Sequence, residues 1–169
     1  MKALSRFALV LFIGFASACG VEGSTQIAPS SDLPERFLLA TAPADAQDVG
    51  AVWQSAQAGA DVAVRGVVGG TEKPFVEGLA AFTLVDPALK SCVGDDMGCK
   101  TPWDYCCVDP GTIAKNSVTV EFRDGTRPLA ASPRGFHGLD HLKTVVVRGV
   151  VERDAQGNVT IVASGVRPL

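Results

Sequence analysis

The sequence lacks the short motifs that mark the common catalytic sites. It contains no G-x-S-x-G, P-loop, G-x-G-x-x-G or H-E-x-x-H pattern, and its carboxylates are scattered along the chain. We therefore expect a protein that is not an enzyme, with neither catalytic residues nor an organic cofactor. The chain also has no excess of basic residues, because its net charge is −3. This charge excludes a general electrostatic attraction to nucleic acid.

Long apolar runs are almost absent as well. Outside the N-terminal region no segment reaches the ~20 apolar residues of a membrane-spanning helix. The N-terminal run from Phe7 to Phe15 is too short to be a stable span; Lys2 and Arg6 precede it and the small residues Ala16-Ser17-Ala18 follow it. A basic start, a short apolar stretch and small residues, in this order, predict a secretory signal peptide.

Cys19 directly follows these small residues. This arrangement resembles the lipobox of bacterial lipoproteins, and the resemblance covers residues 1–19. It implies that residues 1–18 are removed as a signal peptide and that Cys19 becomes a diacylglyceryl-modified, acylated N-terminus carrying chains such as palmitate. The protein is then expected to be held on a membrane of the bacterial cell envelope by its lipid anchor. Gly20, in place of Asp, implies the outer membrane in a cell with two membranes, facing the periplasm or the cell surface.

The mature chain divides into a tether and one domain. Residues 19–44 are rich in Ser and Pro and predict a flexible lipidated tether, in which Phe37-Leu38-Leu39 either docks on the domain or stays loosely ordered. Residues 45–169 predict the domain. Its first element is a helix over residues 45–58, because Val49, Val52, Trp53 and Ala56 share one helical face. Asp45 or Asp48 is expected to cap this helix.

Five strands are expected after the helix, because apolar residues alternate with polar ones in five runs. The runs are Asp61–Val68, Ala80–Val85, Ser117–Phe122, Thr144–Val151 and Asn158–Val166. A turn at Asp154–Asn158 joins the last two as a hairpin.

One pentapeptide occurs twice, as Val64-Arg65-Gly66-Val67-Val68 and as Val147-Arg148-Gly149-Val150-Val151. Each glycine falls inside a predicted strand, where it usually marks a bulge or a bend at a barrel corner. The two V-x-G-x-V strands, with Phe-Thr-Leu-Val-Asp ending the strand after the first, resemble OB-fold domains of the tRNA-anticodon-binding type over about residues 61–166. The resemblance implies an all-β, five-stranded OB-like barrel with neighbouring first and fourth strands.

Most of the candidate functional residues lie in a long cysteine-rich loop between the second and third expected strands. Pro87 to Asn116 contains no regular element that the sequence pattern predicts, and loops of this length are usually functional or cross-linked. The loop carries Cys92, Cys99, Cys106 and Cys107. It resembles an insertion in bacterial lipoproteins of unassigned function, which implies no activity.

Two chemistries suit these four cysteines. In an exported protein an even number of cysteines favours disulfides, with Cys92 and Cys99 each bonded to one of the adjacent pair Cys106 and Cys107. The alternative is a zinc or copper site with four thiolate ligands. Possible further ligands are Asp95, Asp96, Asp104, His137 and His141.

Trp103 and Tyr105 flank Asp104 in the same loop. Exposed aromatic side chains there stack on a sugar or a base, and buried ones cover a disulfide. We therefore expect a membrane-anchored, extracytoplasmic binding or scaffold module with a disulfide-stapled loop. Its partner would be an envelope protein, a peptide or a glycan, and not nucleic acid. The alternative function is a zinc- or copper-binding lipoprotein.

Overall fold

A computed structural model describes residues 31–93 and 98–169. Cys19, the expected signal peptide and the possible ligands Asp95 and Asp96 lie outside the described residues. In the part of the chain that is described, no helix has both the length and the apolar character needed to cross a membrane.

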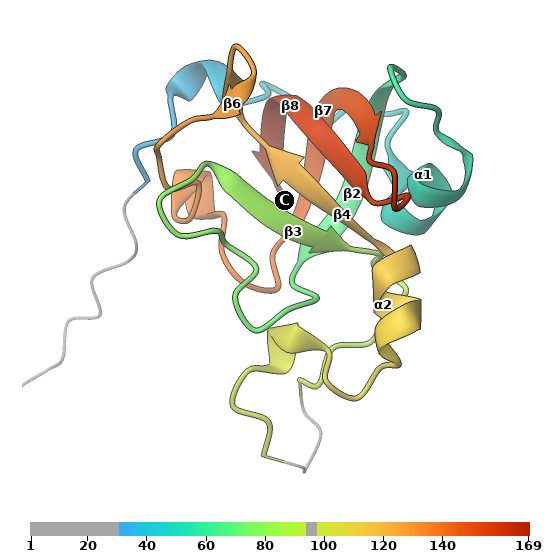
Figure 1. Cartoon of the computed structure of the whole chain (residues 1–169). Coiled ribbons are helices and arrows are strands. Elements are labelled where there is room, and N and C mark those ends of the chain that lie inside the picture. The colour runs from blue at the N-terminus through green and yellow to red at the C-terminus, as the bar shows by residue number, and fades with distance from the viewer. Residues whose placement is uncertain (1–30, 94–97) are drawn as a thin grey trace, which may run out of the picture.

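Five strands close into a barrel (Figure 1). They are β2 (Asp61–Val68), β3 (Ala81–Val85), β4 (Ser117–Glu121), β7 (Thr144–Arg153) and β8 (Val159–Pro168). The sheet runs β2-β3-β4-β8-β7, and β7 pairs again with β2 to complete the ring. All pairs are antiparallel except β4 with β8. The prediction of an all-β, five-stranded OB-like barrel is therefore confirmed.

The repeated glycines lie where neighbouring atoms leave no room for a side chain. A Cβ on Gly149 would lie 2.4 Å from the carbonyl oxygen of Val162, and the pairing of β7 with β8 shifts register between Arg148 and Gly149. A Cβ on Gly66 would lie 2.8 Å from Cγ2 of Val49 in the helix that covers the barrel. The two strands are neighbours, as expected. However, the glycines do not face each other, because Gly66 pairs with Val145 and Gly149 with Val62.

The N-terminal helix is shorter than the sequence predicts. Helix α1 spans Val49–Ser55, because Gln47–Asp48 forms a short strand, β1, that pairs in parallel with β2. Asp48 occupies the N-cap position, as expected, but its side chain makes no capping hydrogen bond. The Gly50 amide donates a 2.7 Å hydrogen bond to the buried carboxylate of Asp86, whereas Asp48 pairs with Arg65. As predicted, the helix buries Val49 and Val52.

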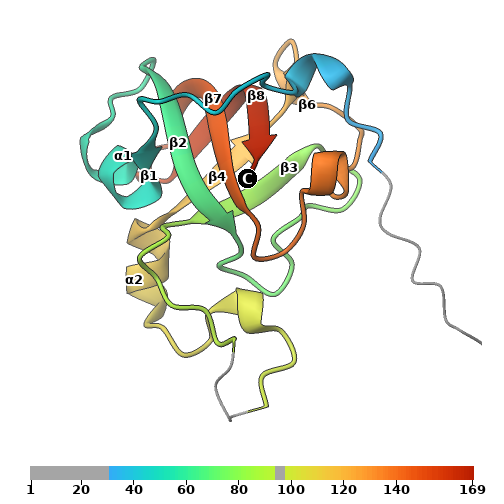
Figure 2. The same cartoon turned by 180° about the vertical axis from the view of Figure 1, so that it is seen from behind.

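The described part of the expected tether packs on the barrel. A 3₁₀ turn, η1 (Glu35–Phe37), places Phe37 in the core with 6% exposure, and its ring lies edge-on to Phe122 at 4.9 Å. Leu39 donates its amide to the carbonyl of Val166 on β8. Figure 2 shows this arm, in blue, crossing one end of the barrel. The packed body therefore begins near Leu33, which is also buried, and not at residue 45.

The cysteine-rich loop contains regular structure that the sequence pattern did not predict. A 3₁₀ turn, η2, spans Pro102–Asp104, and helix α2 spans Pro110–Lys115. Asp109 caps α2 by accepting the Thr112 amide at 2.8 Å. Both elements lie at the end of the barrel opposite η1 (Figure 1).

The connection from β4 to β7 contains a small hairpin and no α-helix. The hairpin pairs β5 (Arg123–Asp124) with β6 (Arg127–Pro128). After this hairpin the chain makes one 3₁₀ turn, η3 (Phe136–Gly138), which buries Phe136.

Candidate metal centre

The sulfur atom of Cys106 lies within 3.9 Å of the sulfur atoms of the other three cysteines of the loop. Cys92 Sγ lies 3.4 Å from Cys107 Sγ and 3.7 Å from Cys106 Sγ. Cys106 Sγ lies 3.7 Å from Cys99 Sγ and 3.9 Å from Cys107 Sγ. All four separations exceed the ~2.05 Å of a disulfide bond. Thiolates at ~2.3 Å from one tetrahedral zinc ion would lie ~3.8 Å apart, so the spacing fits shared ligation of one ion.

The turn around Asp104 sets this geometry. Its carboxylate accepts the Thr101 hydroxyl at 2.7 Å and the Cys106 amide at 2.8 Å. Tyr105 adopts the left-handed region, with φ of 59°, and the chain there reverses direction. The Cys92 amide donates to the carbonyl of Pro102 at 3.2 Å. These bonds bring Cys92 against the adjacent pair Cys106 and Cys107.

Two contacts tie the cluster to the end of β2. The Gly70 amide donates to the Trp103 carbonyl at 2.8 Å, and the Trp103 indole N–H donates to the Glu72 carbonyl at 3.0 Å. A Cβ on Gly69 would meet that Trp103 carbonyl oxygen at 2.7 Å, so the loop approaches closely because residue 69 is glycine. Sequence patterns did not indicate this role for Gly69 and Gly70, because they lie far from the cysteines in sequence.

The thiols of the cluster differ in acidity. A hydrogen bond from the Cys107 backbone amide, and next the contact with the Cys107 thiol, lower the pKa of the Cys92 thiol. The opposite holds for Cys106, whose neighbours Cys92, Cys99 and Cys107 raise its pKa. Hydrogen bonds from Thr101 and Cys106 lower the pKa of Asp104. The Cys92 thiol therefore loses its proton more readily than the Cys106 thiol does.

Asp104 lies next to the cysteine sulfur atoms, whereas the two histidines do not. Ligand atoms of Cys92, Cys99, Cys106 and Asp104 all lie within 4.8 Å of one another. Neither described histidine joins this group, which corrects their proposed role as further ligands. His137 pairs with Glu35 at 2.8 Å, and His141 stacks on Trp103 at a centroid distance of 4.2 Å. His137 lies in the 3₁₀ turn η3, and His141 lies beyond its end.

Tyr105 and Trp103, the two aromatic residues of the loop, both pack against other parts of the protein. Tyr105 is 1% exposed, so it packs under the cluster and does not offer a ring to a ligand. Trp103 is half-buried, with His141 stacked on its ring. The burial of Tyr105 argues against its stacking on a sugar or a base. The described cysteines form no disulfide for these aromatics to cover.

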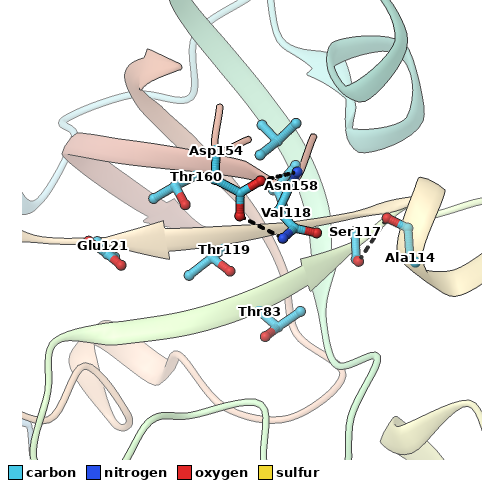
Figure 3. Close-up of a pocket in the computed structure, with 10 residues that line it drawn as sticks. Thr83, Ala114, Ser117, Val118, Thr119, Glu121, Asp154, Asn158 and Thr160 are labelled. Atoms are coloured by element: carbon cyan, nitrogen blue, oxygen red, sulfur yellow. Dashed lines mark hydrogen bonds between the residues drawn. The ribbon is translucent and has the colours of Figure 1, made fainter. Parts of the chain in front are cut away.

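A second feature, a polar hollow of about 320 Å³ on the barrel wall, had no signal in the sequence. Figure 3 shows hydroxyl side chains from three strands lining it, with the Asp154–Asn158 turn at its rim. These hydroxyls belong to Thr83 on β3, Ser117 and Thr119 on β4, and Thr160 on β8. Alternation places them outward while their apolar neighbours fill the core.

Comparison with known proteins gives no family. No protein-family model matches the chain, and no curated protein matches it. The barrel and the cysteine cluster are therefore the observations from which a function has to be argued.

Proposed function

We propose that this protein is an extracytoplasmic metal-binding module in which Cys92, Cys99, Cys106 and Cys107 hold one Zn²⁺ ion beside an OB-like barrel. Four separations of 3.4–3.9 Å among their sulfur atoms carry the proposal. The ligand atoms of Cys92, Cys99 and Cys106 are mutually close, and Cys107 joins them through Cys92 and Cys106. Zinc takes four ligands in tetrahedral sites and accepts thiolates readily. Asp104, whose carboxylate lies beside the sulfurs, acts as a hydrogen-bond partner of Cys106 and orients it.

The ion would cross-link the long cysteine-rich loop, as the expected disulfides would. The metal closes the segment from Cys92 to Cys107, which contains η2 and rests on Gly69 and Gly70 through Trp103. Copper(I) is the alternative ion, because thiolates also suit it. The four-sulfur grouping favours zinc.

We propose in addition that the protein is exported and acts in the cell envelope. The signal-like leader and Cys19 support export, lipidation and attachment to the cell envelope, at the outer membrane in a cell with two membranes. Exported thiols tend to pair in an oxidising compartment. Thiolates that capture zinc during folding are protected, because metal binding and folding of such loops are coupled.

The competing proposal is the disulfide-stapled binding module. Two disjoint pairs in the cluster would suit it, Cys92 with Cys107 at 3.4 Å and Cys99 with Cys106 at 3.7 Å. Each pair would have to close to ~2.05 Å. The two proposals differ in the number of free thiols. Two disulfides leave none of the four cysteines as a thiol, whereas the metal site needs all four.

Cobalt substitution tests the metal site directly. Co²⁺ added to metal-free protein should give the intense visible and near-ultraviolet absorption of a tetrahedral cobalt–thiolate centre, with one equivalent saturating the signal. Zn²⁺ should then displace the cobalt. Octahedral, weakly coloured cobalt throughout the titration would contradict the proposal.

Metal affinity should fall as the pH falls. Protons compete for thiolates, and the raised pKa of Cys106 means that its proton must be displaced on binding, whereas the lowered pKa of Cys92 favours its ligand form. Each thiol that loses a proton on binding should lower the zinc affinity by up to about tenfold per pH unit below neutrality. A zinc affinity that is unchanged between pH 7.5 and pH 5.5 would show that thiols are not the ligands.

We also propose that the polar hollow on β3, β4 and β8 binds a hydroxyl-rich partner, such as an envelope glycan or a polar peptide. Its support is the row of outward hydroxyls from Thr83, Ser117, Thr119 and Thr160. Titration with glycans or peptides should shift the backbone amide resonances of β4 and β8. Shifts confined to other surfaces would place the partner elsewhere.

A further inference from the structure

A hollow lined by aromatic rings, called here the aromatic hollow, opens where the β2–β3 connection meets the cysteine-rich loop. Its volume is about 240 Å³, and Phe75, Trp103 and His141 line it with their rings. The Trp103 and His141 rings are stacked with their centroids 4.2 Å apart, and the Phe75 ring meets the His141 ring at 5.4 Å. The aromatic hollow shares no lining residue with the polar hollow on β3, β4 and β8.

Two of the three rings belong to segments that hydrogen bonds fix in place. Phe75 forms an isolated β-bridge with Phe82 on β3. The Trp103 indole N–H donates to the Glu72 carbonyl at 3.0 Å, which ties this ring to the β2–β3 connection as well. Both rings are therefore in position before a ligand arrives, and such preorganisation lowers the entropy cost of binding.

The third ring lies next to a strained residue. Leu142 follows His141 and has a φ of 60°, which a bulky side chain rarely adopts. Its amide donates to the Val68 carbonyl at 2.9 Å, and the His141 amide donates to the Asp140 carboxylate at 2.8 Å. Backbone strain that the surrounding structure maintains in this way is concentrated at functional sites.

The charged side chains that line the aromatic hollow balance one another. Two are acidic and two are basic, namely Glu72, Glu77, Lys73 and Arg134. Burial, and then the charge of Arg134, lower the pKa of His141, so the imidazole ring is neutral at pH 7. The lining therefore offers both hydrogen-bond donors and acceptors without a net charge.

These charged side chains are open to a ligand. Arg134 Nε donates to Asp140 at 2.8 Å, and no residue that the structure describes accepts a hydrogen bond from the two terminal nitrogens of Arg134. The side chains of Glu72, Lys73 and Glu77 likewise form no hydrogen bond with the described part of the chain. Because Asp140 offsets the charge of Arg134, the hollow has no excess of positive charge that would attract an anion.

We propose that the aromatic hollow binds one ring of a neutral pyranose sugar. A sugar hydroxyl both donates and accepts hydrogen bonds, so it suits the carboxylates of Glu72 and Glu77 together with the guanidinium of Arg134. The C–H face of the sugar ring would pack on the aromatic side chains. A volume of about 240 Å³ lies below the ~300–1,000 Å³ of sites for drug-sized ligands, so it suits a single ring. The site does not depend on the proposed zinc centre.

Titration of the full chain with methyl β-D-glucopyranoside, followed through its amide and indole NMR resonances, tests this site. The Trp103 indole and Leu142 amide resonances should shift and saturate, with a dissociation constant of about 1–10 mM. Sorbitol has similar hydroxyls but no ring, and glucuronate adds a negative charge, so each should bind at least about fivefold more weakly. Shifts confined to β4 and β8 would place the sugar in the polar hollow and overturn the proposal.

Arg134→Gln should weaken binding of the glycoside about tenfold, because hydrogen bonds from a charged donor are lost. Arg148→Gln is the matched control and should alter the affinity less than twofold. Arg148 lies outside the hollow, its side chain is 40% exposed against 42% for Arg134, and its Nε also pairs with an aspartate, Asp61, at 2.9 Å.

Glu77→Gln keeps the test valid if Arg134→Gln disturbs the fold, because Glu77 is exposed. It should weaken binding of the glycoside about threefold, since a charged acceptor is replaced by a neutral one. Equal effects of Arg134→Gln and Arg148→Gln, or sorbitol binding as tightly as the glycoside, would overturn the proposal. So would the absence of any saturable shift at Trp103 and Leu142.

Discussion

Replacing Cys92 with alanine should abolish stoichiometric zinc binding. Cys92 is the most buried of the four cysteines, and its sulfur lies 3.4 Å and 3.7 Å from those of Cys107 and Cys106. Removing one thiolate from a four-sulfur site should weaken zinc binding by at least about a thousandfold, or ~4 kcal/mol, because structural zinc sites owe ~10–16 kcal/mol to the complete set. Competition with a chelator of known affinity measures the change.

Ser91→Ala provides the control for this variant, because it alters the adjacent position without removing a sulfur. It should retain one zinc per chain. The metal-free forms of wild type and Cys92→Ala should unfold at similar denaturant concentrations, so the difference between them should arise only when zinc is present. Full zinc retention by Cys92→Ala would contradict the assignment of this residue as a ligand.

Replacing Gly149 with alanine should strongly destabilise the barrel. The added Cβ would meet the backbone oxygen of Val162 at 2.4 Å and Cγ2 of Ile161 at 2.8 Å. Backbone in a paired strand cannot move aside without breaking the β7–β8 ladder, so we expect a loss of ~3 kcal/mol or more in the free energy of unfolding. Urea unfolding monitored by Trp fluorescence measures the change.

Two control variants should destabilise the barrel less than Gly149→Ala does. Gly66→Ala should cost less, about 1–2 kcal/mol, because the nearest backbone atom to its new Cβ, the carbonyl oxygen of Val85, lies at 3.0 Å, and the closer contact at 2.8 Å is with a side-chain methyl of Val49. Val150→Ala changes an exposed neighbour of Gly149 and should cost under about 1 kcal/mol. If Gly149→Ala unfolded at the wild-type urea concentration, the close approach of β7 and β8 would not be what requires glycine.

The barrel could be predicted from the sequence because its signals are local. Alternation of apolar residues marks the strands, and the repeated V-x-G-x-V marks the two strands that close the ring. Helix α2 was missed because its signals, a capping Asp109 followed by Pro110, occupy a segment with no apolar periodicity. The length of α1 was overestimated because the pairing of Gln47 and Asp48 with β2 is a tertiary contact that overrides helical periodicity.

The candidate site was only partly predictable. Sequence spacing singled out the four cysteines but left disulfides and metal binding open, because that choice depends on distances across the loop. The left-handed turn at Tyr105 and the anchoring at Gly69 decide these distances, and neither has a local signature.

The metal content of the protein purified from its native envelope, with its thiols counted after denaturation in chelator, tests the central claim most directly. The account predicts one zinc ion per chain and four titratable thiols from Cys92, Cys99, Cys106 and Cys107. Metal-free protein whose mass shows two disulfides among these cysteines would contradict it and would establish the stapled loop in its place.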